Sequence, residues 1–165
     1  MQAVDGVPRR YASRVCRLAL LALAVGLLAA GCGGGSSEPK TFSQQADALC
    51  QRAEGEFDKL GDPPGFGERY AAWVDKAVEI AAEYTAGLSA LEPPSSLEGA
   101  FQSYVFVEES ALGSLRDIKK KLAEIAGTLQ DTRQAVQPYL DKLSALSTRE
   151  NPLEARLGMV ECAKT

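Results

Sequence analysis

Apolar residues that recur alternately three and four positions apart constrain the fold of this chain more than any other feature. The longest run covers residues 97–129 and is interrupted by one acidic residue, Glu108. This spacing places the side chains on one face of an α-helix, and a stripe of this length is typical of helical bundles and coiled coils. No segment alternates apolar and polar residues between turn signals, so we expect no β-sheet. The sequence therefore predicts an all-α fold.

Shorter runs of the same kind predict the other helices. Segments rich in glycine and proline at 61–65 and 93–94 separate the first three helices, and a break is expected at 130–131. An asparagine followed by a proline at 151–152 has the pattern of an N-cap before the first helical position, which predicts a short last helix. The predicted helices cover residues 42–60, 66–91, 97–129, 136–146 and 153–160.

Two of these helices begin with the spacing of a capping box. Thr41 precedes Gln44 by three positions, and Ser95 precedes Glu98 by three. The short connections imply that consecutive helices are antiparallel. Residues 41–165 are therefore predicted to form one domain, an up-down antiparallel helical bundle of about four helices plus a short C-terminal helix.

The first 31 residues have the pattern of a secretory signal. Residues 1–17 carry four arginines, and residues 18–30 are uncharged and almost entirely aliphatic. Thirteen helical residues span roughly 20 Å, which is short of the ~30 Å hydrocarbon core of a bilayer. We therefore expect an export signal rather than a transmembrane helix.

The end of this leader, Leu28-Ala29-Ala30-Gly31-Cys32, resembles the lipobox of bacterial lipoproteins, although its leucine lies one position further from the cysteine than usual. The resemblance implies that residues 1–31 are removed as a lipoprotein signal peptide. It also implies that Cys32 carries a diacylglycerol and further acyl chains such as palmitate. The alternative is an ordinary signal peptide cut near Ala30, with Cys32 a free thiol.

A lipidated Cys32 would make the protein exported and lipid-anchored to the outer face of the cytoplasmic membrane, or to an outer membrane if the cell has one. Residues 32–40 are then a flexible Gly/Ser tether between the anchor and the bundle. The leader holds four of the 18 basic and one of the 22 acidic residues, so the remainder has 14 basic and 21 acidic residues. This acidic body does not suggest nucleic acid as a partner. The expected partners are the membrane and an envelope protein.

The chain contains no histidine, which removes the commonest general base and metal ligand. Cys50 and Cys162 are an even pair in an exported chain, which predicts a disulfide; two buried, unpaired thiols are the alternative. We therefore expect no enzyme, no metal site, no catalytic residue, and no cofactor apart from the lipid on Cys32.

Glu108 breaks the apolar stripe and is the candidate for a buried functional residue. Folding the second and third helices as a hairpin places it opposite Ala81, near Tyr84. One interpretation makes Glu108 the polar anchor of an inter-helix ligand pocket with Tyr84, Tyr104 and Trp73. The other, which we favour at this point, lets the stripe drift toward Leu112 and leaves Glu108 at a solvated edge.

Three short segments resemble a family of small predicted lipoproteins from actinobacteria: Ala46-Asp47-Ala48-Leu49-Cys50, Leu91-Glu92-Pro93-Pro94 and Leu157-Gly158-Met159-Val160-Glu161-Cys162. The resemblance implies the helical class and the disulfide, and it assigns no catalytic residue. The expected function is that of a membrane-anchored interaction or structural module of the cell envelope. The alternative is a small-ligand carrier or sensor with an inter-helix pocket.

Overall fold

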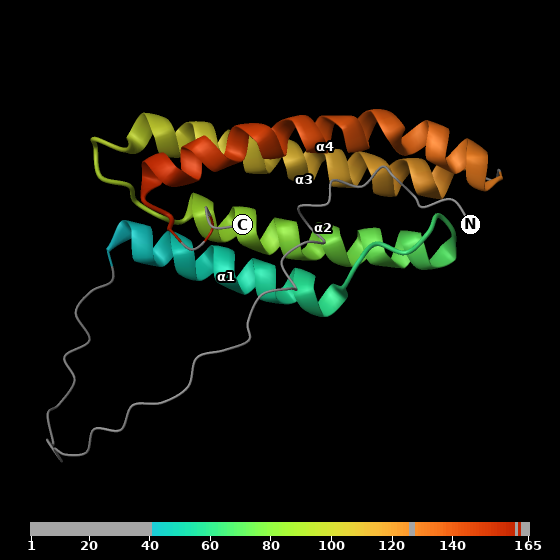
Figure 1. Cartoon of the computed structure of the whole chain (residues 1–165), viewed down its shortest axis with the longest axis horizontal. Helices are drawn as coiled ribbons and strands as arrows, with labels where there is room; N and C mark the ends of the chain where they lie inside the picture. Colours follow the sequence, from blue (N-terminus) through green and yellow to red (C-terminus); the bar gives the residue numbers. More distant parts are fainter. Residues whose placement is uncertain (1–40, 126–127, 161, 163–165) are drawn as a thin grey trace, which may run out of the picture.

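The computed structural model describes residues 41–125, 128–160 and 162 of the chain. The described residues form four α-helices and no strand: α1 (Phe42–Leu60), α2 (Glu68–Ser89), α3 (Glu98–Glu124) and α4 (Leu129–Leu157). Figure 1 shows these helices side by side and running alternately in opposite directions. The predicted all-α, up-down bundle is confirmed. The predicted signal peptide and tether, with Cys32, lie outside the described residues.

Local signals explain both ends of α1. The Thr41 hydroxyl accepts a hydrogen bond from the Gln44 N–H at 3.3 Å, and the Gln44 side chain accepts one from the Thr41 N–H at 2.9 Å. This is the predicted capping box. Gly61 ends the helix at φ 73°, a left-handed value that glycine adopts without steric cost.

The predicted capping box of α3 is wrong. Leu97 occupies the N-cap position with nearly helical backbone angles, and no side chain caps the helix. The reason is a tight turn just before the helix, in which the Leu97 N–H donates to the Pro94 carbonyl at 2.8 Å. This turn shifts the start of the helix beyond the position that Ser95 could cap.

The boundary between α3 and α4 also differs from the prediction. α3 ends at Glu124, and a capping box between Thr128 and Asp131 starts α4 where a break was expected. α4 then continues through Pro138 and Pro152, so the separate short C-terminal helix is part of α4. A proline inside a helix removes one backbone hydrogen bond. Burial of Leu157 one turn later helps to offset that loss.

Two hydrophobic cores occupy different parts of the bundle. The first, which we call the clipped core, consists of Phe42, Ala46, Cys50, Leu88, Ala100, Phe101, Tyr104, Leu157, Met159 and Cys162. The second, which we call the distal core, consists of Tyr70, Val74, Ile118, Val136 and Leu140. The clipped core draws on all four helices, whereas the buried residues of the distal core come from α2, α3 and α4 only.

A disulfide and a hydrogen bond tie the chain's last described segment to α1. Cys50 and Cys162, 112 residues apart, are bonded, so the predicted disulfide is present in the structure. The Ser43 hydroxyl also donates to the Leu157 carbonyl at 3.0 Å. Gly158 ends α4 at φ 70°, after which the chain crosses toward α1 and α2 (Figure 1). None of the described helices combines the length and apolar character needed to cross a bilayer.

Candidate functional site

A cavity of about 70 Å³ lies between the helices next to the distal core. Its walls come from all four helices and from the loop between α1 and α2. They are almost entirely apolar, and their one carboxyl group belongs to Glu108. The lining residues are Phe57, Pro63, Tyr70, Trp73, Val74, Ala77, Ala81, Tyr84, Glu108, Ala111, Leu115, Ile118, Leu140 and Leu143.

Small side chains explain why space remains here. Ala77 and Ala81 on α2 and Ala111 on α3 all line the cavity. The α2–α3 hairpin predicted from the sequence brings Glu108 and Ala81 to this same space. A methyl group fills little of the gap between two helices, so larger neighbours form a wall around an unfilled volume.

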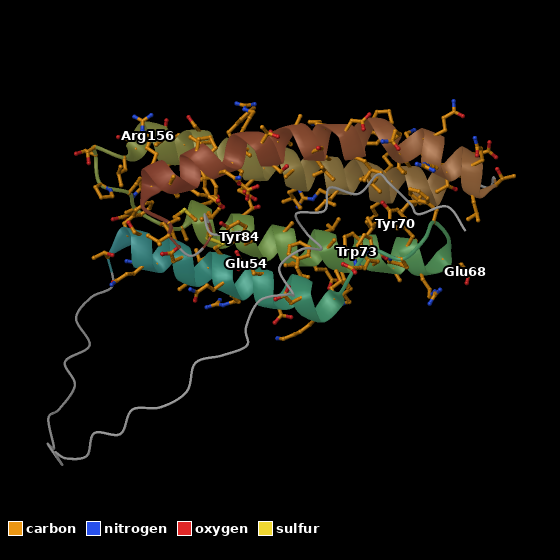
Figure 2. The ribbon with its side chains drawn as sticks, viewed as in Figure 1. Glu54, Glu68, Tyr70, Trp73, Tyr84 and Arg156 are labelled. Atoms are coloured by element: carbon orange, nitrogen blue, oxygen red, sulfur yellow. A yellow bond between two sulfur atoms is a disulfide. The ribbon has the colours of Figure 1, made fainter. Side chains whose placement is uncertain are left out.

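Aromatic side chains close the cavity toward the α1–α2 loop. Trp73 and Tyr70 lie in a stacked arrangement with ring centroids 6.4 Å apart (Figure 2). The Trp73 indole N–H donates to the Gly61 carbonyl at 2.9 Å, which ties the loop to α2. Burial raises the pKa of Tyr70 to about 12, so its hydroxyl stays protonated.

A cluster of buried polar groups adjoins the cavity through Tyr84 and Glu108. The Tyr84 and Tyr104 hydroxyls are 2.6 Å apart, and the Tyr104 hydroxyl donates to the Glu154 carboxylate at 3.3 Å. Glu154 is only 4 % exposed, and Glu150, one turn earlier on α4, hydrogen-bonds to Glu108.

The surroundings of Glu108 in this cluster perturb its acidity strongly. Burial, then the charge and hydrogen bond of Glu150 and the charge of Glu154, hold the pKa of the Glu108 carboxyl well above its usual value. A hydrogen bond with Tyr104 acts in the opposite direction. Two carboxyls can hydrogen-bond to each other only if one carries a proton. One carboxyl of the Glu108–Glu150 pair therefore carries a proton.

The same surroundings perturb both tyrosines. Burial, and next the negative charge of Glu108, raise the pKa of Tyr84 and of Tyr104 above the usual 10.0. Both hydroxyls therefore remain donors at neutral pH. Of this cluster, Tyr84 and Glu108 line the cavity, so it presents one neutral hydroxyl and one carboxyl with a raised pKa to that space.

The structure brings together the four pocket residues that the sequence suggested. Trp73, Tyr84 and Glu108 line the cavity, and Tyr104 contacts the latter two by hydrogen bonds. Neither interpretation holds in full. Leu112 is buried, as the drifting stripe requires, and Glu108 is half-buried at the edge of that stripe while also lining the cavity. Its position is not an open one, because α4 packs on α3 and brings the carboxyls of Glu150 and Glu154 close to it.

Sequence reasoning missed Glu150 and Glu154. They are four positions apart and therefore share one face of a continuous α4. The predicted helices ended at 146 and began again at 153, which left Glu150 in the connection and Glu154 in the last helix and concealed this face. A reading that carried the helix through Pro152 would have placed both acids on the side of Leu146 and Leu157.

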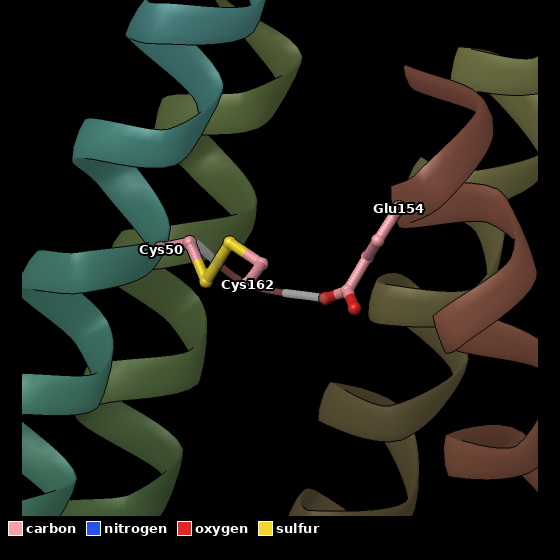
Figure 3. Close-up of side chains that lie close together, drawn as sticks. All are labelled: Cys50, Glu154 and Cys162. Atoms are coloured by element: carbon pink, nitrogen blue, oxygen red, sulfur yellow. A yellow bond between two sulfur atoms is a disulfide. The ribbon is translucent and has the colours of Figure 1, made fainter. Parts of the chain in front are cut away.

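Glu154 also reaches toward the disulfide (Figure 3). Among the described residues, Cys50, Cys162 and Glu154 have potential metal-ligand atoms within 4.8 Å of one another. The two sulfurs are bonded to each other, so neither is the thiolate that binds metals. The absence of a metal site stays a prediction.

Comparisons of the chain with models of protein families, with curated proteins and with solved structures found no match. The resemblance to small actinobacterial lipoproteins therefore stays a prediction.

Proposed function

We propose that the protein is a membrane-anchored lipoprotein of the cell envelope that binds a small apolar ligand, as a carrier or a sensor. The cavity beside Glu108 carries this proposal. Ligand sites are typically concave and mostly apolar, with a few placed polar groups, and often lie between the helices of bundles. Trp73, Tyr84 and Glu108 provide those groups in an otherwise aliphatic wall.

The size of the cavity limits the ligand. A cavity of about 150 Å³ holds benzene, and this one has about half that volume. A ligand of a few carbon atoms fits without rearrangement of the helices. Larger ligands require a shift of α1 or α4.

Binding without catalysis fits the composition of the chain. The protein has no histidine, and the described Cys50 and Cys162 are joined to each other. The remaining acid–base candidates at the site are the carboxyls and tyrosines of the buried cluster. The raised pKa values of Glu108, Tyr84 and Tyr104 keep protons on these groups, which suits recognition of a ligand.

Native mass spectrometry of the protein purified from its own membranes tests the binding function. We expect the wild-type protein to retain a small molecule. Ala111→Phe fills the cavity from α3 and should abolish retention, whereas Ala123→Phe on an exposed position of the same helix should not. Equal retention by both variants, or none by the wild type, would contradict the proposal.

The anchor is tested separately at Cys32. In the bacterial cell, Cys32→Ser should move the protein from the membrane fraction to the medium or periplasm, because two or more acyl chains give stable attachment. Incorporation of labelled palmitate should disappear in the same variant. Unchanged fractionation would exclude Cys32 as the anchor.

Docking of an envelope protein is a second candidate function, favoured by Phe106. This side chain lies in the first half of α3 and is 58 % exposed, whereas its neighbour Val107 is buried. Exposed aromatic residues are enriched where proteins bind one another. Cross-linking in whole cells through a photoreactive residue at position 106 tests this docking function. A photoreactive residue at position 102, which is exposed one turn earlier on the same helix, is the control.

A further inference from the structure

We infer that the pocket selects a small hydrophobic amine, bound as a cation with its ammonium group at Glu108. This inference rests on the proposed ligand-binding function and names the chemical class of the ligand. Three observations support it: the position of the one carboxyl in the cavity wall, the charges behind that carboxyl, and the shape of the remaining wall.

Among the described residues that line the cavity, Glu108 is the only acidic one, and none is lysine or arginine. Aliphatic and aromatic side chains form the rest of the wall. A ligand that matches this surface has an apolar body and one polar group. The polar group must lie at the Glu108 side, because an ammonium against the alanines or leucines would lose its hydration without a partner.

The charges around Glu108 select the sign of that group. The ionisable groups facing its carboxyl are Glu150 and Glu154 from α4, Tyr104 from α3 and Tyr84 from α2. All of them are acidic. A carboxylate ligand would meet like charges in a poorly solvated place, whereas an ammonium would meet opposite charges at hydrogen-bonding distance.

Binding also has a proton balance. The empty pocket keeps a proton on the Glu108–Glu150 pair, and an ammonium ion makes that proton unnecessary. The pair therefore loses its proton to solvent as the cation enters, and the amine keeps its own. We expect binding at pH 7 to release up to about one proton per ligand.

Isothermal titration of the full-length chain with three ligands of similar branched skeleton tests the inference: isobutylamine, isobutanol and isobutyrate. We expect isobutylamine to bind about tenfold tighter than isobutanol or more, since a hydrogen bond to a charged group is stronger than a neutral one. Isobutyrate should bind weakest. Titrations in two buffers of different ionisation enthalpy measure the released proton.

Glu108→Gln should remove the preference for the amine and the proton release while keeping the binding of isobutanol. Glu109→Gln makes the same charge change at an exposed neighbouring position and should keep both. If isobutanol binding is lost in Ala111→Phe, the isobutanol binds in the cavity next to Glu108.

The outcomes separate the two proposals. If isobutanol or isobutyrate binds as tightly as isobutylamine, the amine inference is overturned and the pocket stands. The same holds if Glu108→Gln keeps the amine preference. If none of the three ligands binds, both the inference and the proposed binding function are overturned.

Discussion

At the clipped core, four helices, a disulfide and a segment that follows α4 close around Tyr104, Leu88 and Met159, all of which are fully buried. At the distal core, three helices supply the buried residues, and α1 contributes only Phe57 to the wall of a cavity. The bundle is therefore closed covalently where it is already well packed and left incompletely filled elsewhere. This difference suggests that one region maintains the fold while the other is free to serve binding.

Removal of the disulfide should have the largest effect on this contrast. The double variant Cys50→Ser/Cys162→Ser opens a loop of 112 residues, and loop-entropy models assign about 5 kcal/mol to such a cross-link. We expect the free energy of unfolding, measured in urea, to fall by about that amount. Native-state hydrogen exchange should speed up more at the clipped core than at the distal core. Equal acceleration in both would show that they open as one unit.

Replacement of a leucine by alanine should also distinguish the two cores, with smaller changes in the free energy of unfolding. Leu88→Ala removes a fully buried side chain from the clipped core and should cost about 3 kcal/mol, because it creates a new cavity. Leu143→Ala enlarges an existing cavity from a partly exposed position and should cost about 1 kcal/mol. Thermal and urea unfolding of the pair measure the difference. Equal losses would mean that the distal core is packed as tightly as the clipped core.

Glu108→Gln should stabilise the protein at neutral pH by an amount on the order of 1 kcal/mol, because the amide keeps hydrogen-bonding capacity without the proton that the Glu108 carboxyl must take up on folding. The pKa of Glu108 is raised in the folded protein, so the folded state holds a proton that the unfolded state releases above about pH 4.5. Wild-type stability therefore falls relative to the variant as the pH rises above that value.

Urea unfolding at pH 4 and pH 8 tests the direction of this pH dependence of stability. The difference between Glu108→Gln and the wild type should be small at pH 4 and larger at pH 8, and exposed Glu109→Gln should show no such trend. A difference that shrinks with rising pH would contradict the assigned environment of Glu108.

The helix caps should produce the smallest effects. Thr128→Ala removes the side chain that accepts from the Asp131 N–H at 3.3 Å and should cost about 1 kcal/mol. Ser95→Ala should change the free energy of unfolding by less than about 0.5 kcal/mol, since no side chain caps α3. Thermal unfolding compares the two, and a larger loss at Ser95 would reinstate the capping box expected from the sequence.

Residues that cap or end helices decided which parts of the fold could be predicted. α1 and α2 are bounded by Thr41, Gly61 and prolines, whose effects act within a few residues. The α3–α4 boundary was obscured because Ile125 and Leu129 continue the apolar spacing beyond the end of α3. The Thr128–Asp131 pair carried the correct signal, since it has the spacing of a capping box.

The site was harder to predict, because it depends on contacts between distant helices. Glu108 could be singled out within one helix as an acid in an apolar stripe. Its partners on α4 could not, since periodicity in one helix does not specify which residues of another helix lie against it. The cavity likewise arises from alanines on two helices that are unremarkable when each helix is considered alone.

Trp73 gives this molecule a built-in optical probe. It is the only tryptophan of the 165 residues, and it lies in the cavity wall with its indole N–H bonded to the Gly61 carbonyl. Its fluorescence therefore reports on the distal core alone. Emission spectra can follow filling of the cavity or loosening of the α1–α2 loop without a label, while the disulfide-linked part of the bundle contributes no tryptophan signal.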